Sequence, residues 1–222
     1  MQQLERDLIV TQVETTREYE KNLGYFIIKR IIDVIGALCG ILLLSPVMMI
    51  FAIWIKLDSK GPVFFAQNRV GQDGKLFKMY KFRSMCLDAE ALIEKLKEKN
   101  EMSGPMFKIK EDPRITKVGK FIRNTSIDEL PQLFNILNGE MSIVGPRPSL
   151  PKEVAQFTSF QKQRLIAKPG LTCYWQVRGR NDISFDEWME MDVEYLTNRN
   201  TLVDIGLILK TVRVLFGDKG AR

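Results

Sequence analysis

The stretch "VIGALCGILLLSPVMMIFAIWI", residues 34–55, decides the fold class of this chain. Its 22 residues include no charged side chain. About 20 apolar residues are enough for a helix to cross the hydrocarbon core of a bilayer. A surface helix of a soluble domain would show one polar face, whereas this run is apolar on every side. We therefore expect a membrane helix here rather than a buried core helix.

The centre and the flanks of this run argue against a simple span. Ser45 and Pro46 stand at its centre, where a proline removes a backbone hydrogen bond and kinks a helix. Basic residues keep adjoining loops cytoplasmic, and here they flank both ends: Lys29 and Arg30 before the run, Lys56, Lys60 and Arg69 after it. A kinked, re-entrant helix that enters and leaves by one face fits this pattern better than a straight span. A straight transmembrane span remains the alternative interpretation, because proline also occurs in true transmembrane helices.

Two further features are typical of a membrane interface. Asp33, at the start of the apolar run, would lie near the interface and could pair with Lys29 or Arg30. Near the other end of the chain, "TLVDIGLILKTVRVLF" (residues 201–216) forms an apolar stripe with Lys210 and Arg213 on the other side. This segment suits a core helix and a helix on the membrane surface equally well.

Composition excludes several kinds of chemistry. The 222 residues carry a formal net charge of +6 and contain no histidine, which removes Ser-His and Cys-His nucleophile pairs and most zinc sites. The three cysteines, Cys39, Cys86 and Cys173, are too far apart for a disulfide framework or a CxxC site, and a reducing compartment fits them best. Carboxylates, Lys, Arg or a hard metal held by oxygen must therefore carry any catalysis, and the positive charge suits an anionic partner.

The rest of the pattern predicts an α/β domain that is rich in helix and has small pieces of sheet. "PVFFAQNRVG" and "LFKMYKFRSM" read as strands joined by the turn "GQDGK", and "SFDEWMEMDVEYLTN" as a helix. We divide the chain into a polar N-terminal tail or helix (1–24), the re-entrant membrane helix (25–58) and a domain with surface amphipathic helices (59–222). The tail lacks the features of a secretory signal.

Two adjacent acids in "SIDELPQLFNIL" (residues 126–137) have two explanations. Ser126 and Glu129 have the spacing of a capping box, and Asp128 would then simply favour the helix dipole. Alternatively, the helix start keeps Asp128 ionised, as a nucleophile or a metal ligand must be. Sequence spacing alone leaves both explanations open.

Several basic residues are candidates for a phosphate site, against the alternative of a scattered solvated surface. A guanidinium on a stiff loop suits phosphate recognition, and Arg147 stands between two prolines. The other candidates are Lys81 and Arg83 in "YKFRSM", Arg123 just before the acids, and Arg178 and Arg180 around Gly179. Asp192 reads either as a surface acid or as a further acid near the site.

An ordered series of motifs resembles one family. It includes "KRIIDVIGAL", "LLLSPVMM", "FFAQNRVG", "YKFRSM", "DPRITKVGKFIRNTSIDELPQLFNILNGEMSIVGPRP", "KPGLTCYWQVRGRNDISF" and "MDVEYL". These resemble the bacterial monotopic phosphoglycosyl transferases, or bacterial sugar transferases, in their minimal catalytic form. The resemblance runs from about residue 26 to residue 216.

The resemblance implies an enzyme that moves a sugar-1-phosphate from a UDP-sugar to undecaprenyl phosphate and releases UMP. This would be the first membrane step of exopolysaccharide, capsule or O-antigen synthesis, at the cytoplasmic face of the bacterial inner membrane. Asp128 would form a covalent phosphosugar intermediate, with Glu129 as its partner and Mg²⁺ bound at the pair.

The resemblance also assigns residues and partners. Lys81, Arg83, Arg123, Arg147, Arg180 and Asp192 become the phosphate and nucleotide site, Ser45 and Pro46 the break in the re-entrant helix, and Lys29, Arg30 and Asp33 its anchor. The expected partners are the UDP-sugar, undecaprenyl phosphate and the lipid bilayer; a homo-oligomer stays open. Cys173 and Arg178 stand where many relatives have Gly and Asn, so no sugar identity follows.

Two other functions compete with this one. A membrane-bound scaffold or anionic-lipid-binding module would keep the basic residues and the apolar run without needing the two acids. A nucleic-acid-binding protein would share the positive charge, but the apolar run argues against it, and we expect no nucleic-acid partner.

Overall fold

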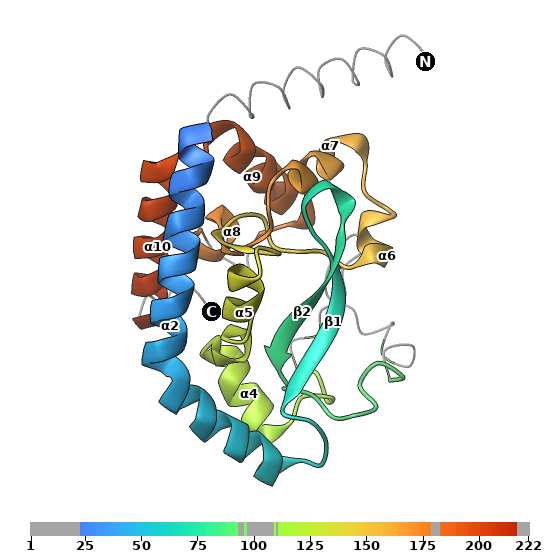
Figure 1. Ribbon diagram of the computed structural model, residues 1–222. Helices are drawn as coiled ribbons and strands as arrows, with labels where there is room; N and C mark the ends of the chain where they lie inside the picture. The colour runs from blue at the N-terminus through green and yellow to red at the C-terminus, as the bar shows by residue number, and fades with distance from the viewer. Residues whose placement is uncertain (1–22, 93–95, 97–108, 110, 179–182, 217–222) are drawn as a thin grey trace.

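The computed structural model describes residues 23–92, 96, 109, 111–178 and 183–216 (Figure 1). Most elements are helices, and the strands form two small two-stranded sheets, so the expected helix-rich α/β class is confirmed. In chain order the elements are α2 (Leu23–Asp58), β1 (Phe64–Val70), η1 (Gln72–Gly74), β2 (Leu76–Phe82), α4 (Lys117–Asn124), η3 (Ile127–Glu129), α5 (Gln132–Leu137), β3 (Ser142–Val144), α6 (Pro151–Val154), α7 (Ser159–Lys162), η4 (Gln163–Ile166), β4 (Gly170–Thr172), α8 (Tyr174–Val177), α9 (Phe185–Asn198) and α10 (Thr201–Phe216).

The apolar run forms the middle of α2, one continuous helix of 36 residues with Pro46 inside it. Figure 1 shows that α2 changes direction in its second half, so that it curves around the rest of the molecule. Beside the proline, the Ser45 hydroxyl donates a hydrogen bond to the carbonyl of Leu42 at 3.0 Å. A hydroxyl bond to the preceding turn commonly accompanies a bend. Re-entry of this helix into a membrane stays a prediction.

One face of α2 packs along the domain and the others are exposed. The buried residues recur at helical spacing: Tyr25, Asp33, Ala37, Met48, Phe51 and Ile55. Gly36 permits close approach, because a Cβ there would lie 2.6 Å from Cδ1 of Ile143. Large apolar side chains cover the exposed faces, among them Ile27, Ile31, Ile35, Leu38, Leu42, Leu43, Ile50, Ile53 and Leu57. By length and composition, α2 is able to cross a membrane.

The polar residues near the start of α2 bind the domain rather than one another. Lys29 donates from Nζ to Oδ2 of Asp204 on α10 at 2.7 Å. Arg30 donates to the carbonyls of Ile136 and Leu137 at the end of α5, both at 2.7 Å. The carbonyl end of a helix attracts a cation. These bonds fix α2 to α5 and α10.

Asp33 also contacts the domain. Its Oδ1 accepts hydrogen bonds from the hydroxyl of Ser142 at 2.9 Å and from the backbone N–H of Ile143 at 2.8 Å. The expected pairing of Asp33 with Lys29 or Arg30 is therefore wrong. Lys29 and Arg30 bond to α10 and α5 instead, and the start of β3 supplies the donors that a buried carboxylate needs.

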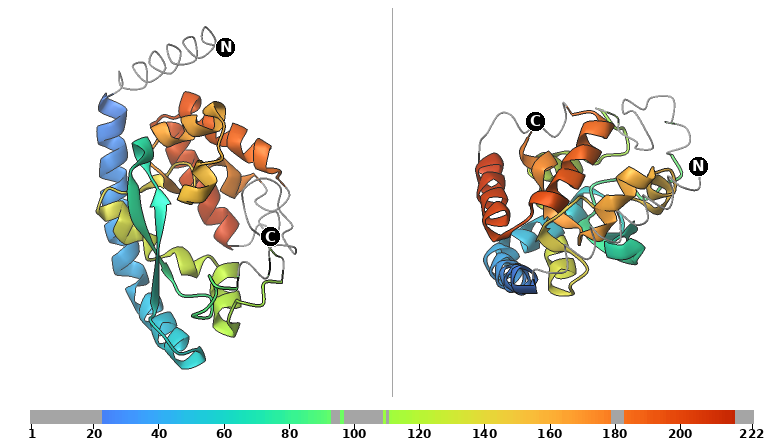
Figure 2. Two further views of the ribbon diagram at one scale, coloured as in Figure 1. Left: turned by 90° about the vertical axis from the view of Figure 1, so that its right-hand side faces the viewer. Right: turned by 90° about the horizontal axis from the view of Figure 1, so that it is seen from above.

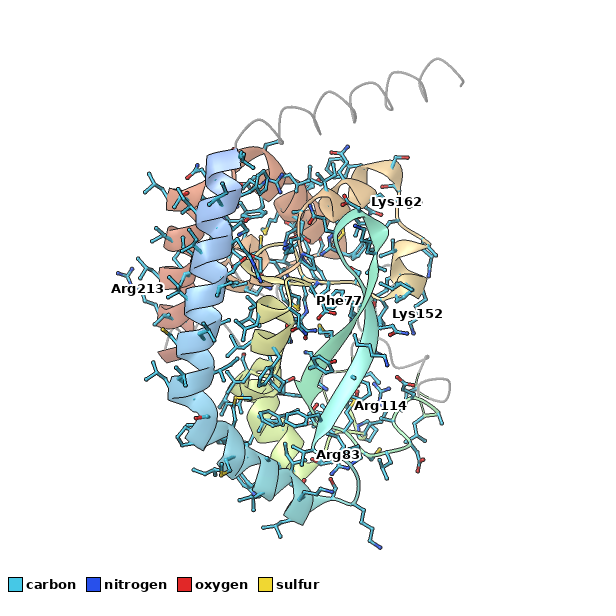
Figure 3. The ribbon with its side chains drawn as sticks, in the orientation of Figure 1. Phe77, Arg83, Arg114, Lys152, Lys162 and Arg213 are labelled. Atoms are coloured by element: carbon cyan, nitrogen blue, oxygen red, sulfur yellow. The ribbon has the colours of Figure 1, made fainter. Side chains whose placement is uncertain are left out.

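The helix α10 lies beside α2, as Figures 1 and 2 show from different sides. Asp204 and Leu207 on its inner face are buried. Its outer face exposes an apolar stripe at helical spacing: Leu202, Ile205, Leu209 and Val212. Arg213 points outward from the same helix (Figure 3). One face thus packs as a core helix would, while another keeps the apolar surface expected of a membrane-facing helix.

The predicted hairpin is confirmed. β1 and β2 pair antiparallel, with Phe65 opposite Lys81, around a short turn in which Asp73 takes a φ of 55° and Gly74 a φ of 78°. Positive φ is what Gly and Asp tolerate best. β3 and β4 pair parallel elsewhere in the domain. The charged segment "DAEALIEKLKEK" (residues 88–99), whose pattern predicts an amphipathic helix, falls mainly outside the described residues, and residues 88–92 form turns.

Candidate functional site

The two adjacent acids lie on a tight connection rather than in a capped α-helix. Asp128 and Glu129 belong to η3, a single 3₁₀ turn between α4 and α5. Ser126, just before it, has a left-handed backbone (φ 58°) and makes no side-chain capping bond. The capping-box explanation is therefore wrong. Pro131 occupies the position immediately before α5, where its missing N–H costs no helical hydrogen bond.

Tertiary packing brings Lys81 and Arg147 onto this turn. Lys81, from β2, donates from Nζ to Oε1 of Glu129 at 2.8 Å and lies 3.6 Å from Oδ2 of Asp128. Arg147, from the loop after β3, donates from Nη2 to the same oxygen of Glu129 at 2.8 Å. Asp128 itself is 7% exposed. Three segments far apart in sequence thus place two cations against two acids.

The two carboxyls have opposite electrostatic environments. Burial raises the pKa of Asp128 above its ordinary value; the positive charge of Lys81 opposes this, and the charge of Glu129 adds to it. Burial also acts to raise the pKa of Glu129, but the charges of Arg147 and Lys81 outweigh it and hold that pKa well below its usual range. We expected a helix start to keep Asp128 ionised. Instead, the charge of Lys81 is the main influence that favours the ionised form of Asp128 against burial.

Hydrogen bonds hold the loop that carries Arg147 along its whole length. Four successive carbonyls of the loop each accept one from another segment: Pro146 from the N–H of Gly170 (3.0 Å), Arg147 from Arg164 (2.6 Å), Pro148 from Arg69 (3.2 Å) and Ser149 from the N–H of Val70 (2.9 Å). A loop tied at every residue keeps its side chains in one place.

Arg69 adds a cation that the sequence marked only as a flanking charge. It donates to the side-chain oxygen of Gln67 at 2.9 Å as well as to Pro148. Burial, and then the like charge of Arg147, lower the pKa of Arg69 to about 10. Two guanidinium groups close together favour an anion bound between or beside them. The hairpin register that brings Arg69 to this loop is a long-range feature that no local motif signals.

Asp192 lies behind the loop, not on its surface. It is fully buried on α9, and its Oδ2 lies 2.6 Å from Nη2 of Arg164. Burial raises the pKa of Asp192 to about 6, while the charge of Arg164 opposes that rise. Arg164, on η4, is a residue that the sequence did not single out. The place of Asp192 in a phosphate site stays a prediction, and its contacts here are with Arg164.

The other predicted phosphate-binding residues, Arg83, Arg123 and Arg180, do not share one location. Arg83 donates to the carbonyls of Ser59 (2.7 Å) and Lys60 (2.6 Å), just beyond the end of α2, where Figure 3 labels it. It therefore caps that helix end, and its assignment to phosphate stays untested. Arg123 is exposed on α4, and its charge helps to lower the pKa of Asp128. Arg180 lies outside the described residues.

The carboxylates of Asp128 and Glu129 suit a metal ion that takes most of its other ligands from water or substrate. Within the described ranges, no three His, Cys, Asp or Glu side chains gather where they could enclose a metal ion. Mg²⁺ is commonly held by one or two carboxylates together with water and substrate phosphates. Asp128 and Glu129 fit that arrangement. Of the two carboxylate oxygens of Glu129, the hydrogen bonds from Lys81 and Arg147 both go to Oε1, which leaves Oε2 for a metal ion. Magnesium itself stays a prediction.

Comparison with known proteins identifies the family of this chain. Residues 24–218 match the model of the family described as bacterial sugar transferase. A galactosyl transferase CpsE of Streptococcus agalactiae is 48% identical over 90% of this chain and 44% of its own length. An undecaprenyl-phosphate galactose phosphotransferase of Salmonella typhimurium is 41% identical over 87% of this chain and 41% of its own length.

A shorter relative matches over most of its length. The exopolysaccharide production protein ExoY of Sinorhizobium fredii is 36% identical over 87% of both chains. This chain therefore spans less than half of the first two relatives but most of the third. With the family match covering nearly all of the described residues, the chain belongs to the bacterial sugar transferase family.

Proposed function

We propose that this protein transfers a sugar-1-phosphate from a UDP-sugar to undecaprenyl phosphate at a membrane surface. The observation that carries the proposal is the arrangement of a buried Asp128 beside Lys81, with Glu129 fixed by Lys81 and Arg147. A scaffold function requires neither the buried carboxylate of Asp128 nor Glu129 beside it, and burying a charged group costs free energy. The names of the relatives, which mention galactose transfer and undecaprenyl phosphate, support the same chemistry.

Asp128 is the proposed nucleophile. Its carboxylate oxygen attacks the β-phosphorus of the UDP-sugar, and the bond from that phosphorus to the bridging oxygen breaks. UMP leaves with that oxygen and its electron pair. An oxygen of the lipid phosphate then attacks the same phosphorus, the bond to Asp128 breaks, and the carboxylate is regenerated. No histidine is needed in either step.

The basic residues stabilise the negative charge of both steps. Phosphoryl transfer depends mainly on positioning and on charge stabilisation. Arg147 and Lys81 already lie at the acids, and Arg69 and Arg123 add positive charge nearby. A Mg²⁺ ion at Asp128 and Glu129 would neutralise phosphate charge when bound. Glu129 orients Lys81 and Arg147 toward the reacting phosphate.

The membrane is the proposed source of the lipid substrate. The exposed apolar faces of α2 and α10 lie side by side, which supports their contact with one leaflet. The change of direction in the second half of α2, together with Pro46 inside the helix, supports the re-entrant form, with both ends at the cytoplasmic face. Such placement puts the site where a lipid phosphate meets a soluble nucleotide sugar. The sugar and the polysaccharide remain open.

UMP release tests the proposal. Purified protein in detergent micelles or lipid discs is mixed with undecaprenyl phosphate, Mg²⁺ and a panel of UDP-sugars. We expect release with at least one UDP-sugar, its loss on chelation with EDTA, and its return with added Mg²⁺. Release with no UDP-sugar of the panel would contradict the proposal.

Substitution of the nucleophile sharpens the test. Asp128→Asn keeps the size of the side chain and removes the carboxylate, so we expect UMP release to fall by about 10³-fold or more while folding persists. Glu190→Gln on the exposed side of α9 is the matched control and should leave the rate unchanged. Trapping of a radiolabelled phosphosugar on wild type but not on Asp128→Asn would support the covalent step.

A further inference from the structure

We propose that Arg164 is a positioning residue that sets Arg147 against Glu129, with Asp192 holding Arg164 in place. The inference rests on the proposed transferase activity, because its readout is kinetic. Arg164 makes no hydrogen bond or ion pair with Asp128 or Glu129 among its described contacts. It acts through the backbone of the loop from Pro146 to Ser149.

The contacts of Arg164 are short and converge on that loop. Its Nη2 donates to the carbonyl of Arg147 at 2.6 Å and its Nη1 to the hydroxyl of Ser149 at 2.6 Å. Its guanidinium also pairs with Asp192 at 2.6 Å. A planar guanidinium has five donors in a fixed geometry, so it holds several acceptors in a defined arrangement. The loop therefore takes its shape partly from one side chain.

The arginine itself is held rigidly. It is 2% exposed, and its guanidinium carbon lies 5.7 Å from the centre of the Phe157 ring and 5.5 Å from that of Trp188. Cations over aromatic faces are stabilised most when they are desolvated. A small pocket next to it, lined by Arg147, Ser149 and Arg164 among others, has a volume of about 10 Å³. The ion pair, the hydrogen bonds and the two rings together hold the guanidinium in place.

Asp192 supplies the opposite charge. A buried guanidinium without a carboxylate would be unfavourable, because its charge would have lost water without gaining a partner. Asp192 lies on α9 and has no exposed surface, so no solvent competes for it. The chain of contacts thus runs from Asp192 to Arg164, from Arg164 to the carbonyl of Arg147, and from the Arg147 side chain to Glu129.

A double-mutant cycle tests this chain of contacts. Arg164→Lys keeps the charge opposite Asp192, but a single ammonium cannot reach the loop carbonyl and Ser149 in the same geometry. We expect Arg164→Lys to lower kcat/KM for UMP release about 10- to 100-fold, as misplacement of a charge-stabilising group does. If Arg164 acts through Arg147, the same change in an Arg147→Ala background should cost less than about 3-fold.

The controls separate positioning from general damage. Lys162→Ala removes an exposed cation two residues away and should leave kcat/KM unchanged. Circular dichroism and thermal unfolding check that each variant is folded. If Arg164→Lys fails to fold, Ser149→Ala takes its place in the cycle, since it removes only the bond from Nη1; we expect about a 3- to 10-fold loss that disappears with Arg147→Ala.

Two results would overturn the inference. One is an equal fold-loss from Arg164→Lys, or from its substitute, in the presence and absence of Arg147. The other is a folded Arg164→Lys with wild-type kcat/KM. Both require wild-type protein that releases UMP, so failure of the proposed function itself shows separately, as a wild type without activity.

Discussion

Arg147 donates from Nη2 to Oε1 of Glu129 over 2.8 Å, which joins the loop after β3 to the turn before α5. This ion pair fixes Glu129 and brings a guanidinium to the two acids. Arg147 and Lys81 lower the pKa of Glu129 despite its burial, whereas the pKa of Asp128 stays raised by burial. The opposite pKa shifts of these two neighbouring acids follow from this contact and from the charge of Lys81.

The pH dependence of the reaction should move in opposite directions in two variants. A nucleophilic Asp128 must be ionised, so activity is lost as pH falls through its pKa. Lys81 lowers that pKa and Glu129 raises it. We expect Lys81→Met to shift the acid limb of kcat/KM to higher pH and Glu129→Gln to shift it to lower pH, each with a large loss of rate. If the acid limbs of the two variants shifted in the same direction, the assignment of Asp128 as the nucleophile would be contradicted.

The ion pair between Lys29 and Asp204 should be important for stability. Its side chains are 12% and 4% exposed, so breaking it leaves a buried carboxylate without its cation. We expect Lys29→Met to lower the free energy of unfolding by about 3 to 5 kcal/mol, measured by thermal unfolding in detergent. Lys56→Met, at the exposed end of the same helix, should change it little. Equal effects of the two would be inconsistent with the pairing.

Asp192 should give stability a specific pH dependence. Its pKa is raised to about 6, above its value in the unfolded chain, so the folded protein binds the extra proton between about pH 4 and pH 6. Its contribution to stability is complete below about pH 4 and is lost as pH rises toward 6. Relative to Asp192→Asn, the wild type should therefore lose about 3 kcal/mol across this window. A pH-independent difference in unfolding temperature would contradict this.

Topology offers a test that does not depend on activity. If α2 is re-entrant, tags placed at residue 1 and at residue 222 should both be protected from a membrane-impermeant label in intact cells. A cysteine placed in a known periplasmic protein serves as the labelled control. External labelling of the N-terminal tag alone would mean that α2 spans the membrane.

Close approach between α2 and the domain should depend on Gly36. A Cβ at this position would lie 2.6 Å from the end of the Ile143 side chain. We expect Gly36→Leu to destabilise the protein by about 1 to 3 kcal/mol, the usual range for overpacking, and a smaller side chain in Ile143→Val to restore part of the loss. No recovery in the double variant would show that the contact is not the cause.

The sequence by itself determined the elements whose signals are local. An apolar run of 22 residues makes a helix of α2, alternation around "GQDGK" makes the hairpin, and the turn residues fix its tip. The motifs also brought Asp128, Glu129, Lys81 and Arg147 to attention. Local periodicity and turn chemistry depend on neighbouring residues, so one sequence is enough to read them.

Only the tertiary structure decided which side chains meet. It turned Arg83 toward the end of α2, placed Asp192 behind the loop on Arg164, and brought Arg69 next to Arg147. It also replaced the expected capping box by a 3₁₀ turn after a left-handed Ser126. Each of these depends on contacts between segments far apart in the chain, where packing and the burial of charge outweigh local preference.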